Sequence, residues 1–485
     1  MQGIKTYQER LFISFQLSER VPRDNFYRRL KETLDLSYLR KLTKQYYGTA
    51  GQKSIDTEVF FKLMLLGYLE NIHSDRKIIE QASMRMDMLY FLGYDIDGPL
   101  PWHSTLSRTR KLSGEEVFLE VFRNILHMCS HAGMVSGRTQ AVDSAFIKAN
   151  ASMDSLVEKE VHETGKQFFN EITANEDEPL QGKLKHSEQF VSTTGPDARV
   201  SQKRGKLPAL NHLGIISVDT QHHVICGAMA EFADIKDSRT TEKIVGQVIE
   251  TLHQTGLDIE EVLADTNYSS GEPYAFLEEN NITAYIPPHG AYTPEREGYV
   301  YDEQADCYIC SQGVKLCFKS IKKEKSRTAF TKQYRTGVAD CSHCPLRPTC
   351  CKKQKYKQIE HSIDKAHYDR AYQLVNTRRG KRMMRLRHST VEPVWGTLLH
   401  FRGLKKVYTK GNELANKQVL LASTAYNLKK LMAFNWIKPA ISVVTNVAEG
   451  LISKIFCFFM TLYKLSMFAL EQHALQKQKM SLFYG

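Results

Sequence analysis

Three acidic residues, far apart in the chain, have the settings expected of carboxylates that bind metal ions. Asp143 lies within the apolar stretch 139–147, Asp265 directly follows the apolar run 262–264, and Glu392 lies in a strongly basic segment. A buried carboxylate is costly unless it is paired or bound to a metal. Mg²⁺ binds through one or two carboxylates together with phosphate oxygens of a substrate. The three acids therefore predict two-metal phosphoryl transfer.

Each of these acids also has a purely structural interpretation, which the sequence leaves open. Asp143 could lie on the exposed face of an edge strand, and Asp265 could begin an ordinary Asx turn. Glu392 could form an ion pair with Arg385 or Arg387. A Walker-type phosphate loop is absent from the sequence, so a polynucleotide backbone is a better substrate than a nucleotide.

Positive charge is concentrated in two segments. Residues 371–410 hold ten Lys and Arg but a single carboxylate, and residues 315–360 hold 13 Lys and Arg but three acids. Their combined charge exceeds the +12 of the whole chain, which has a pI near 9.0. Such a localised basic surface predicts binding to a polyanion. The DNA-contact candidates are Arg385, Arg387, Arg402, Lys405, Lys406, Lys352, Lys353 and Lys355.

Aromatic residues alternate with the basic residues of these segments. They could stack on unpaired bases or fill a small core, and the sequence leaves both open. These residues are Phe318, Phe330, Tyr334 and Tyr356. Trp395, three residues after Glu392, could wedge or stack against DNA or could anchor a helix to the sheet, and we favour the anchor.

Seven of the ten cysteines lie between Cys307 and Cys351. Two of the pairs in this block have the Cys-x2-Cys spacing of zinc knuckles, which predicts a structural zinc site, although reduced cysteines that merely pack are the alternative. The first 23 residues lack the apolar core of a secretory signal. We therefore expect a cytoplasmic, nucleoid-associated protein rather than a disulfide-stapled one.

The surrounding elements must position these residues. β-rich runs at 140–149, 209–218, 224–230, 261–264 and 283–286, with helical periodicity at 240–253 and 273–279, predict an α/β fold with a mixed sheet. Residues 300–360 interrupt it as a Cys-rich insertion. Helical periodicity then returns at 363–386 and 391–431.

The regions at the two ends of the chain are expected to be helical. In residues 1–135, apolar spacing predicts helices at 55–69 and 117–128, with Asp56 and Ser113 as their N-caps. The C-terminal stretch 440–470 is apolar, but Glu449, Lys454 and Lys464 interrupt it, so we expect an amphipathic helix and no membrane span.

Several stretches, in order along the chain, together resemble the bacterial DDE insertion-sequence transposases, specifically the branch usually called IS-eleven-eighty-two. The resemblance covers about residues 40 to 435. The matching stretches are Val142–Ser152, Ser192–Arg199, Phe232–Ser238, Leu263–Glu272, Cys341–Arg347 and His388–Gly396. Gly195 departs from the family pattern where an acid is common, and Trp395 departs where Phe is common.

This resemblance implies a ribonuclease-H-like catalytic core over 136–299 and 361–435, with Asp143, Asp265 and Glu392 as the catalytic triad. It also implies two Mg²⁺ or Mn²⁺ ions. The helical domain 1–135 would help to grip DNA ends, and residues 436–485 would form a helical tail. For zinc, the resemblance marks Cys310, Cys341, Cys344 and Cys350. Because Pro393 disfavours helical geometry at the preceding residue, we expect Glu392 at the entry of a helix.

The sequence therefore predicts a DNA transposase that cuts DNA at the ends of its element and joins the 3′-hydroxyl to target DNA. Its partners would be double-stranded DNA and further copies of the chain, as a homodimer or larger assembly. The alternatives are a DNA-binding regulator or decayed transposase without catalysis, and a ribonuclease-H-like nuclease without strand transfer.

Overall fold

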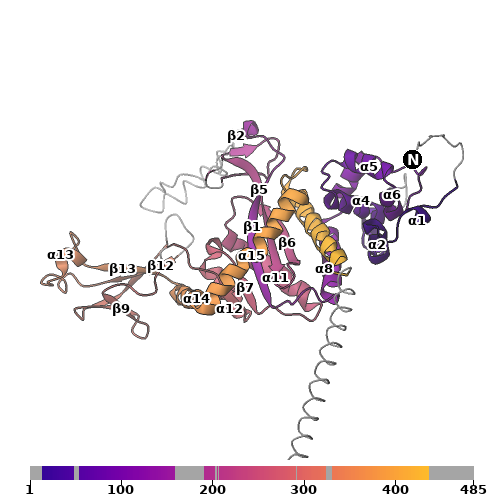
Figure 1. Ribbon diagram of the computed structural model, residues 1–485. Helices are drawn as coiled ribbons and strands as arrows, with labels where there is room; N and C mark the ends of the chain where they lie inside the picture. The colour runs from indigo at the N-terminus through magenta and orange to yellow at the C-terminus, as the bar shows by residue number, and fades with distance from the viewer. Residues whose placement is uncertain are drawn as a thin grey trace, which may run out of the picture. The chain divides into compact units, whose positions relative to one another are not determined.

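The computed structural model (Figure 1) describes residues 14–435 except 49–53, 159–189, 203–204, 206, 291 and 324–329. The chain divides into two compact units, Met1–Leu428 and Lys429–Gly485. Of the second unit only residues 429–435 are described, so the expected helical tail over 436–485 lies outside the described residues. In the described part of the chain, no helix has the length and apolar character needed to cross a membrane.

A six-stranded mixed sheet forms the centre of the first unit, as predicted. Its order is β4-β5-β1-β7-β8, with β6 also paired to β5. β1 pairs antiparallel with β5, which pairs antiparallel with β6, whereas β7 and β8 continue parallel to β1. The strands are β1 (Thr139–Lys148), β4 (Arg199–Ser201), β5 (Ala209–Asp219), β6 (Ile225–Phe232), β7 (Glu261–Leu263) and β8 (Thr283–Tyr285).

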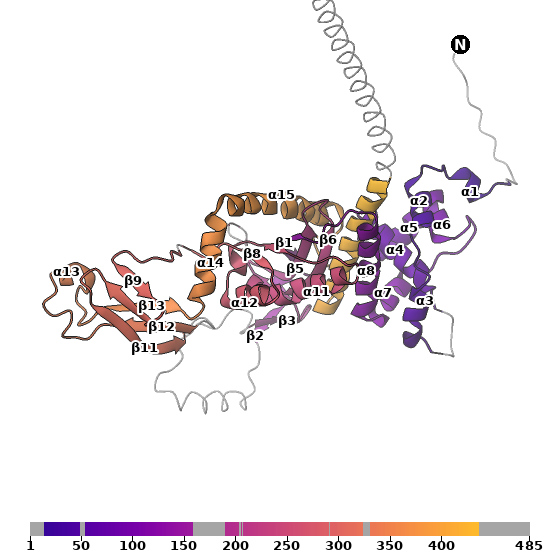
Figure 2. The ribbon, with the colours of Figure 1, turned by 90° about the horizontal axis from the view of Figure 1, so that it is seen from below.

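Helices cover both faces of this sheet (Figure 2). On one face, α11 (Thr241–His253) contacts β5 and β6, and α12 (Gly271–Glu279) contacts β8. On the other, α15 (Arg378–Phe401) crosses β1, β5, β7 and β8. A Cβ atom at Gly214 of β5 would lie 2.9 Å from the Trp395 ring, so glycine permits the close approach of α15. Trp395 is buried, which agrees with its interpretation as an anchor.

The sequence predicted a break between helices at 363–386 and 391–431, and this position was wrong. The chain turns at Thr377, between α14 (Lys365–Asn376) and α15, and the Thr377 side chain accepts from the Gly380 N–H at 2.9 Å. α15 then continues through Pro393, so Glu392 lies inside the helix and not at its entry. Val391, Val394, Trp395 and Leu398 are buried along it. We attribute the continuity of the helix to this burial, which offsets the hydrogen bond that Pro393 removes.

The last helix of the core, over residues 412–435, covers the free edge of β6. Asn416 Oδ1 accepts from the Ala230 N–H, and Asn427 Oδ1 accepts from the Ile225 N–H, both at 2.9 Å. Asn427 also donates to the Ile225 carbonyl at 2.8 Å. These bonds satisfy edge groups that would otherwise be open to pairing with another strand.

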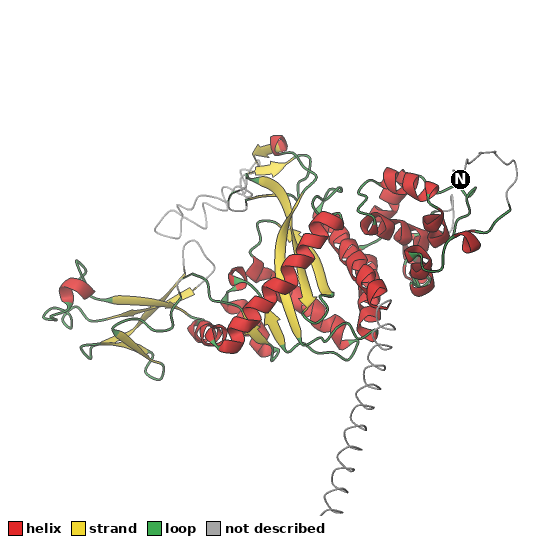
Figure 3. Ribbon diagram, viewed as in Figure 1, coloured by secondary structure: helices red, strands yellow, loops and turns green. Residues whose placement is uncertain are grey.

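Residues 299–362 form a second, five-stranded antiparallel sheet with the order β13-β12-β11-β10-β9 (Figure 3). Its small core consists of Tyr308, Leu316, Tyr334 and Ile359. The strands are β9 (Tyr299–Asp302), β10 (Cys307–Cys310), β11 (Lys315–Lys323), β12 (Phe330–Arg335) and β13 (Gln358–Ser362). The short helix α13 (Arg347–Cys350) precedes β13. A separate two-stranded sheet pairs β2 (Leu156–Glu158) with β3 (Phe190–Ser192).

In the described parts of residues 14–131 the regular elements are all helical. α4 is buried over most of its surface, and its Phe61 ring packs edge-on against Phe118 of α8. The elements are α1 (Leu17–Arg20), α2 (Phe26–Thr33), α3 (Leu39–Leu42), η1 (Lys44–Tyr46), α4 (Thr57–Leu69), α5 (Asp75–Met84), α6 (Met86–Leu92), α7 (His103–Leu112) and α8 (Glu115–His131). Asp56 caps α4, as predicted, but Gly114 rather than Ser113 precedes α8, because α7 extends to Leu112 and Ser113 ends it.

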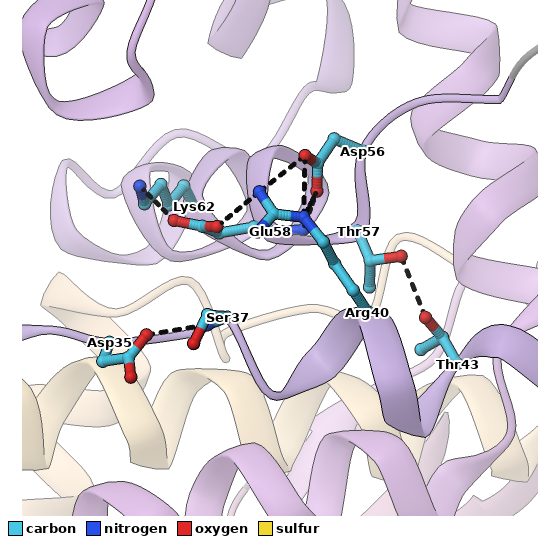
Figure 4. A network of polar contacts seen from close by, with 8 residues as sticks. All are labelled: Asp35, Ser37, Arg40, Thr43, Asp56, Thr57, Glu58 and Lys62. Carbon is cyan, nitrogen blue, oxygen red and sulfur yellow. Dashed lines mark hydrogen bonds and ion pairs between the residues drawn. The ribbon is translucent and has the colours of Figure 1, made fainter.

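A polar network joins α3 to the start of α4 (Figure 4). The Arg40 guanidinium lies 2.8 Å from Asp56 Oδ2 and 2.7 Å from Glu58 Oε2, and Lys62 Nζ lies 2.8 Å from Glu58 Oε1. Two cations thus face two carboxylates. Asp56 also accepts from the Glu58 N–H at 2.9 Å, so the same carboxylate begins the helix.

Candidate active site

Two of the three predicted acids meet at one guanidinium. Arg387 of α15 places Nη2 2.8 Å from Asp143 Oδ1 and 3.9 Å from Asp265 Oδ2. Asp143 comes from the middle of β1 and Asp265 from the end of β7, which lies beside β1 in the sheet. Residues 122 positions apart in sequence are therefore neighbours because their strands are parallel and adjacent.

The sheet explains the position of each aspartate. Asp143 lies on the face of β1 that α15 covers, and Val142 lies in the core on the opposite face. Asp265 is the N-cap of the short helix η4 (Thr266–Tyr268) and accepts from the Asn267 N–H at 2.9 Å. The Asx-turn interpretation of Asp265 is thus also correct. It does not exclude a chemical role, because the residue lies at the carboxyl end of a strand, where α/β sheets bind ligands.

Negative charge is in excess at this point. The pKa of Asp143 is raised to about 6, mainly by burial and also by the charges of Asp265 and Asp237, against the opposing effect of Arg387. The side chain of Arg387 is only 7% exposed, and its Nε atom has no hydrogen-bond partner among the described residues. A single buried cation therefore leaves the aspartates short of positive charge.

A third carboxylate at this site, Asp237, was missed by the sequence interpretation. It opens the short helix η3 (Asp237–Thr240), which contacts η4. Asp237 Oδ1 accepts from the hydroxyl of Ser144 at 2.7 Å, and Ser144 is the strand neighbour of Asp143. Burial raises the pKa of Asp237, and Asp265 adds to the increase. In the sequence it lies within Phe232–Ser238, one of the stretches that carry the family resemblance, but the interpretation gave it no role.

Asp237 lies on the opposite side of β1 from Arg387, because successive strand residues face opposite ways. There the hydroxyl of Tyr268 is fully buried and has no hydrogen-bond partner among the described residues, with Ser144 as a polar neighbour. Burial raises the pKa of Tyr268, and the charges of Asp237, Asp143 and Asp265 raise it further. Asp237 and Tyr268 thus lie behind the strand that carries Asp143.

Glu392 does not join the two aspartates in this structure. Its side chain is 66% exposed and accepts from His388 Nδ1 at 2.8 Å. The five residues from Arg387 to Glu392 correspond to a rise of about 7.5 Å and a rotation of about 140° around a regular helix. Glu392 therefore lies near the aspartates along α15, but on a different face of it. The alternative interpretation, an ion pair with Arg385 or Arg387, is not found among the described residues, where Glu392 pairs with His388 instead.

The carboxylates at this site are of the type that binds divalent cations, but they do not come together as a complete set of metal ligands. Among the described residues, no three His, Cys, Asp or Glu side chains are close enough together to hold a metal ion. Asp143 and Asp265 offer the hard carboxylate oxygens that Mg²⁺ and Mn²⁺ prefer. The raised pKa of Asp143 shows that a further positive charge would stabilise its ionised form. The two aspartates thus fit such an ion in donor type and charge.

The predicted zinc ligands do not form a defined quartet. Cys350 Sγ lies 2.9 Å from the Tyr299 hydroxyl, and Cys341 Sγ lies 3.3 Å from the Thr336 hydroxyl. Cys351, which the prediction omitted, is buried beside Cys341 and Cys350, and burial together with these thiols raises its pKa to about 11. The zinc site over Cys310, Cys341, Cys344 and Cys350 stays a prediction.

The predicted DNA contacts divide into exposed and buried residues. Arg387 and Arg402 are buried, and Arg402 donates to the backbone carbonyls of Leu69 and Phe401. Lys406 is half-buried. The exposed ones are Arg385, Lys405, Lys352, Lys353 and Lys355. The exposed residues can therefore contact DNA phosphates directly, whereas the two buried arginines contact other residues of the fold.

Comparison with known proteins gives two family matches. Residues 15–112 match the model described as "Transposase domain (DUF772)", and residues 309–432 match "Transposase DDE domain". No protein of curated function matches the chain.

Two solved structures are similar over part of the chain. They are "Mos1 transposase paired-end complex with left transposon end", 11% identical over 53% of this chain and 67% of that one, and "Crystal structure of a pre-cleavage Mos1 transpososome", 10% identical over 57% and 76%. The TM-score is 0.16 for both, so we base no conclusion on them. Two separate regions of the chain therefore match transposase domains, and the second of these is a DDE domain.

Proposed function

We propose that this protein is a DNA transposase of an insertion sequence of the IS-eleven-eighty-two type. It would cut DNA at the ends of its element and join the freed 3′-hydroxyl to target DNA. The observation that carries the proposal is the meeting of Asp143 and Asp265 at Arg387 of α15, the helix that also carries Glu392. The strand order, with three antiparallel strands followed by two parallel ones, supports a ribonuclease-H-like core.

Asp143, Asp265 and Glu392 would hold two Mg²⁺ or Mn²⁺ ions. When bound, such ions activate the attacking oxygen and stabilise the leaving one. Arg387 keeps the two aspartates together, and Asp237 supports β1 from behind through Ser144. Glu392 would have to move toward them. Pro393 leaves the carbonyl of Ser389 without its usual helical donor, so α15 is weakest beside Glu392.

The substrate would be double-stranded DNA, bound along the exposed basic side of α15. Arg378, Arg379, Lys381, Arg382 and Arg385 are all exposed there. Each phosphate neutralised by such a residue releases counterions, so binding should weaken steeply as salt increases. Joining two element ends requires at least two catalytic sites in one complex, which supports assembly of two or more copies on DNA. A cytoplasmic, nucleoid-associated location would follow from this substrate.

A cleavage assay tests the proposal. The purified protein is mixed with duplexes that carry the terminal sequences of its element, with Mg²⁺ or Mn²⁺, and nicked and joined products are measured. Asp143→Asn, Asp265→Asn and Glu392→Gln should each reduce both products by on the order of 10³-fold, while end binding persists. Asp56→Asn, in the polar network of α4, is the matched control and should retain activity.

Two outcomes would contradict the proposal. Wild-type rates from Asp143→Asn would remove this residue from the chemistry. End binding without metal-dependent cleavage by the wild-type protein would favour the alternative of a DNA-binding regulator. Cleavage without joined products would instead indicate a nuclease.

A further inference from the structure

The hairpin of β11 and β12 exposes an apolar face that the proposed chemistry does not use. Phe318, Ile321 and Phe330 are 44%, 56% and 42% exposed. The register pairs Phe318 with Tyr334, Ile321 with Lys332, and Lys323 with Phe330. Residues paired across a sheet point to the same face, and these pairs alternate with Ser320–Gln333 and Lys322–Thr331. We call the set Phe318, Ile321, Lys323, Phe330 and Lys332 the hairpin face.

The hairpin face is exposed because the hairpin extends beyond the neighbouring strand. β10 pairs with β11 only from Lys315 to Cys317, and the small core around Leu316 and Tyr334 is centred on this part of the hairpin. From Phe318 onward β11 therefore has β12 on one side and, among the described residues, no strand on the other. Phe318 still packs edge-on against the core residue Tyr334, with ring centroids 6.1 Å apart, whereas Ile321 and Phe330 lie outside the core cluster.

The two strands of the hairpin carry charges of one sign, and the Asp306 carboxylate from outside them pairs with Lys332. Every charged residue of β11 and β12 is Lys or Arg, and Lys319, Lys322 and Lys323 are exposed. Lysines on an open strand edge oppose pairing with another strand, and two copies of this face would repel each other. Lys332 lies 6.0 Å from the centre of the Phe318 ring and is held 3.2 Å from Asp306 Oδ2. The face therefore combines aromatic rings with positive charge.

We propose that the hairpin face binds unpaired nucleotides of a DNA strand, with bases stacked on Phe318 and Phe330 and phosphates neutralised by the surrounding lysines. Rings that alternate with cations are the arrangement that binds single strands independently of sequence. At a rise of about 3.4 Å per residue, the stretch from Phe318 to Lys323 is long enough for roughly two to three nucleotides. The proposal rests on the proposed function, because DNA is the assumed substrate.

Binding is measured with the Asp143→Asn variant of the full chain and no divalent metal, so that affinity is separated from cleavage. The probes are a 12-nucleotide single strand and an abasic strand of the same length and charge, followed by fluorescence anisotropy. The base-containing strand should bind at least about fivefold more tightly, because stacking on an aromatic side chain contributes about 1–3 kcal/mol per base.

Substitutions then assign this preference to the hairpin face. Phe318→Ala with Phe330→Ala should weaken binding of the base-containing strand at least about fivefold, to the level of the abasic strand, and leave the abasic strand unchanged. Phe318→Tyr with Phe330→Tyr retains both rings and should restore binding. Val300→Ala with Val338→Ala, two exposed apolar residues outside the hairpin face, is the matched control. Lys319→Ala with Lys323→Ala should weaken both strands alike and reduce the salt dependence.

Three results would overturn the proposal: equal binding of both strands by the parent protein, equal weakening of both by the alanine pair, or a change of oligomeric state in the alanine pair by light scattering. The last would identify the hairpin face as a protein contact. Failure of the proposed function is distinguishable, because it appears as loss of metal-dependent end cleavage in the wild-type protein, whichever strand is bound more tightly.

Discussion

Two groups of charged side chains in this protein differ in how their charge is balanced. In the network at the start of α4, Arg40 and Lys62 face Asp56 and Glu58. In the central sheet, Asp143 and Asp265 share Arg387 alone, with Asp237 close behind. Burial opposes ionisation of Asp56, but its bonds to Arg40 outweigh that effect and lower its pKa. Burial raises the pKa of Asp143 to about 6 despite Arg387.

This difference separates a structural role from a chemical one. The carboxylates near α4 have their partners within the fold, so they stabilise a helix start and nothing more is needed. The carboxylates of the sheet are held at a cost that the fold does not offset. Strongly perturbed titratable groups of this kind are found preferentially at functional sites.

The largest expected effect comes from removing the central cation. Arg387→Met should lower the free energy of unfolding by about 3–5 kcal/mol at pH 7.5, because two partly buried carboxylates lose their shared partner, a buried guanidinium. The loss should shrink at pH 5, where Asp143 is protonated. Urea unfolding at both pH values measures it. Arg40→Met, at the exposed network, should have a much smaller effect; equal losses in the two variants would break the comparison.

The next prediction compares two isosteric substitutions, Asp143→Asn and Asp56→Asn, which should change the free energy of unfolding at pH 7.5 in opposite directions. Because the folded pKa of Asp143 is near 6, its ionisation lowers the free energy of unfolding by about 3 kcal/mol. This loss of stability develops as the pH rises from about 4 to 6. Asp143→Asn should remove most of this slope and be up to about 2 kcal/mol more stable at pH 7.5, with a smaller slope left from Asp237. The pKa of Asp56 is lowered, so its stabilisation is present at neutral pH and lost in acid.

Asp56→Asn should therefore be slightly less stable at pH 7.5. Unfolding measured from pH 4 to 8 compares the two variants. If both variants are less stable than the wild-type protein at neutral pH, the aspartates of the sheet do not carry the proposed excess of negative charge.

A divalent cation should stabilise one site and not the other. At ten times its Kd, an ion that binds only the folded protein adds about 1.4 kcal/mol. Mn²⁺ should therefore raise the thermal midpoint of the wild-type protein and of Asp56→Asn, but not that of Asp143→Asn, in differential scanning fluorimetry. Equal shifts in all three would place the ion elsewhere.

The smallest expected effect is at Glu392. Its side chain is exposed and, within the part of the chain that the structure describes, pairs only with His388 four residues away, so Glu392→Gln should change the unfolding free energy by no more than about 0.5 kcal/mol. Chemical unfolding of Glu392→Gln and His388→Ala tests this. A loss of several kcal/mol would mean that Glu392 has a structural role in α15, which would weaken its assignment as the third carboxylate.

The sequence predicted the elements of the core better than the connections between them. The apolar runs that became β1, β5, β6 and β7 were correctly placed, because alternation and burial are local properties of the chain. Ser113 and Pro393 misled the prediction, because both are local end signals that packing overrode. Asp237 was missed because its importance depends on Ser144, 93 residues earlier, and no local pattern carries that contact.

By itself, the sequence determined the α/β pattern, the concentration of positive charge and the identity of the acidic candidates. The tertiary structure decided which of them meet. Strand order brings Asp265 beside Asp143, and the packing of α15 directs Arg387 inward and Glu392 outward. The physical reason is that a helix presents different residues according to which face is buried, and burial is a property of the whole fold.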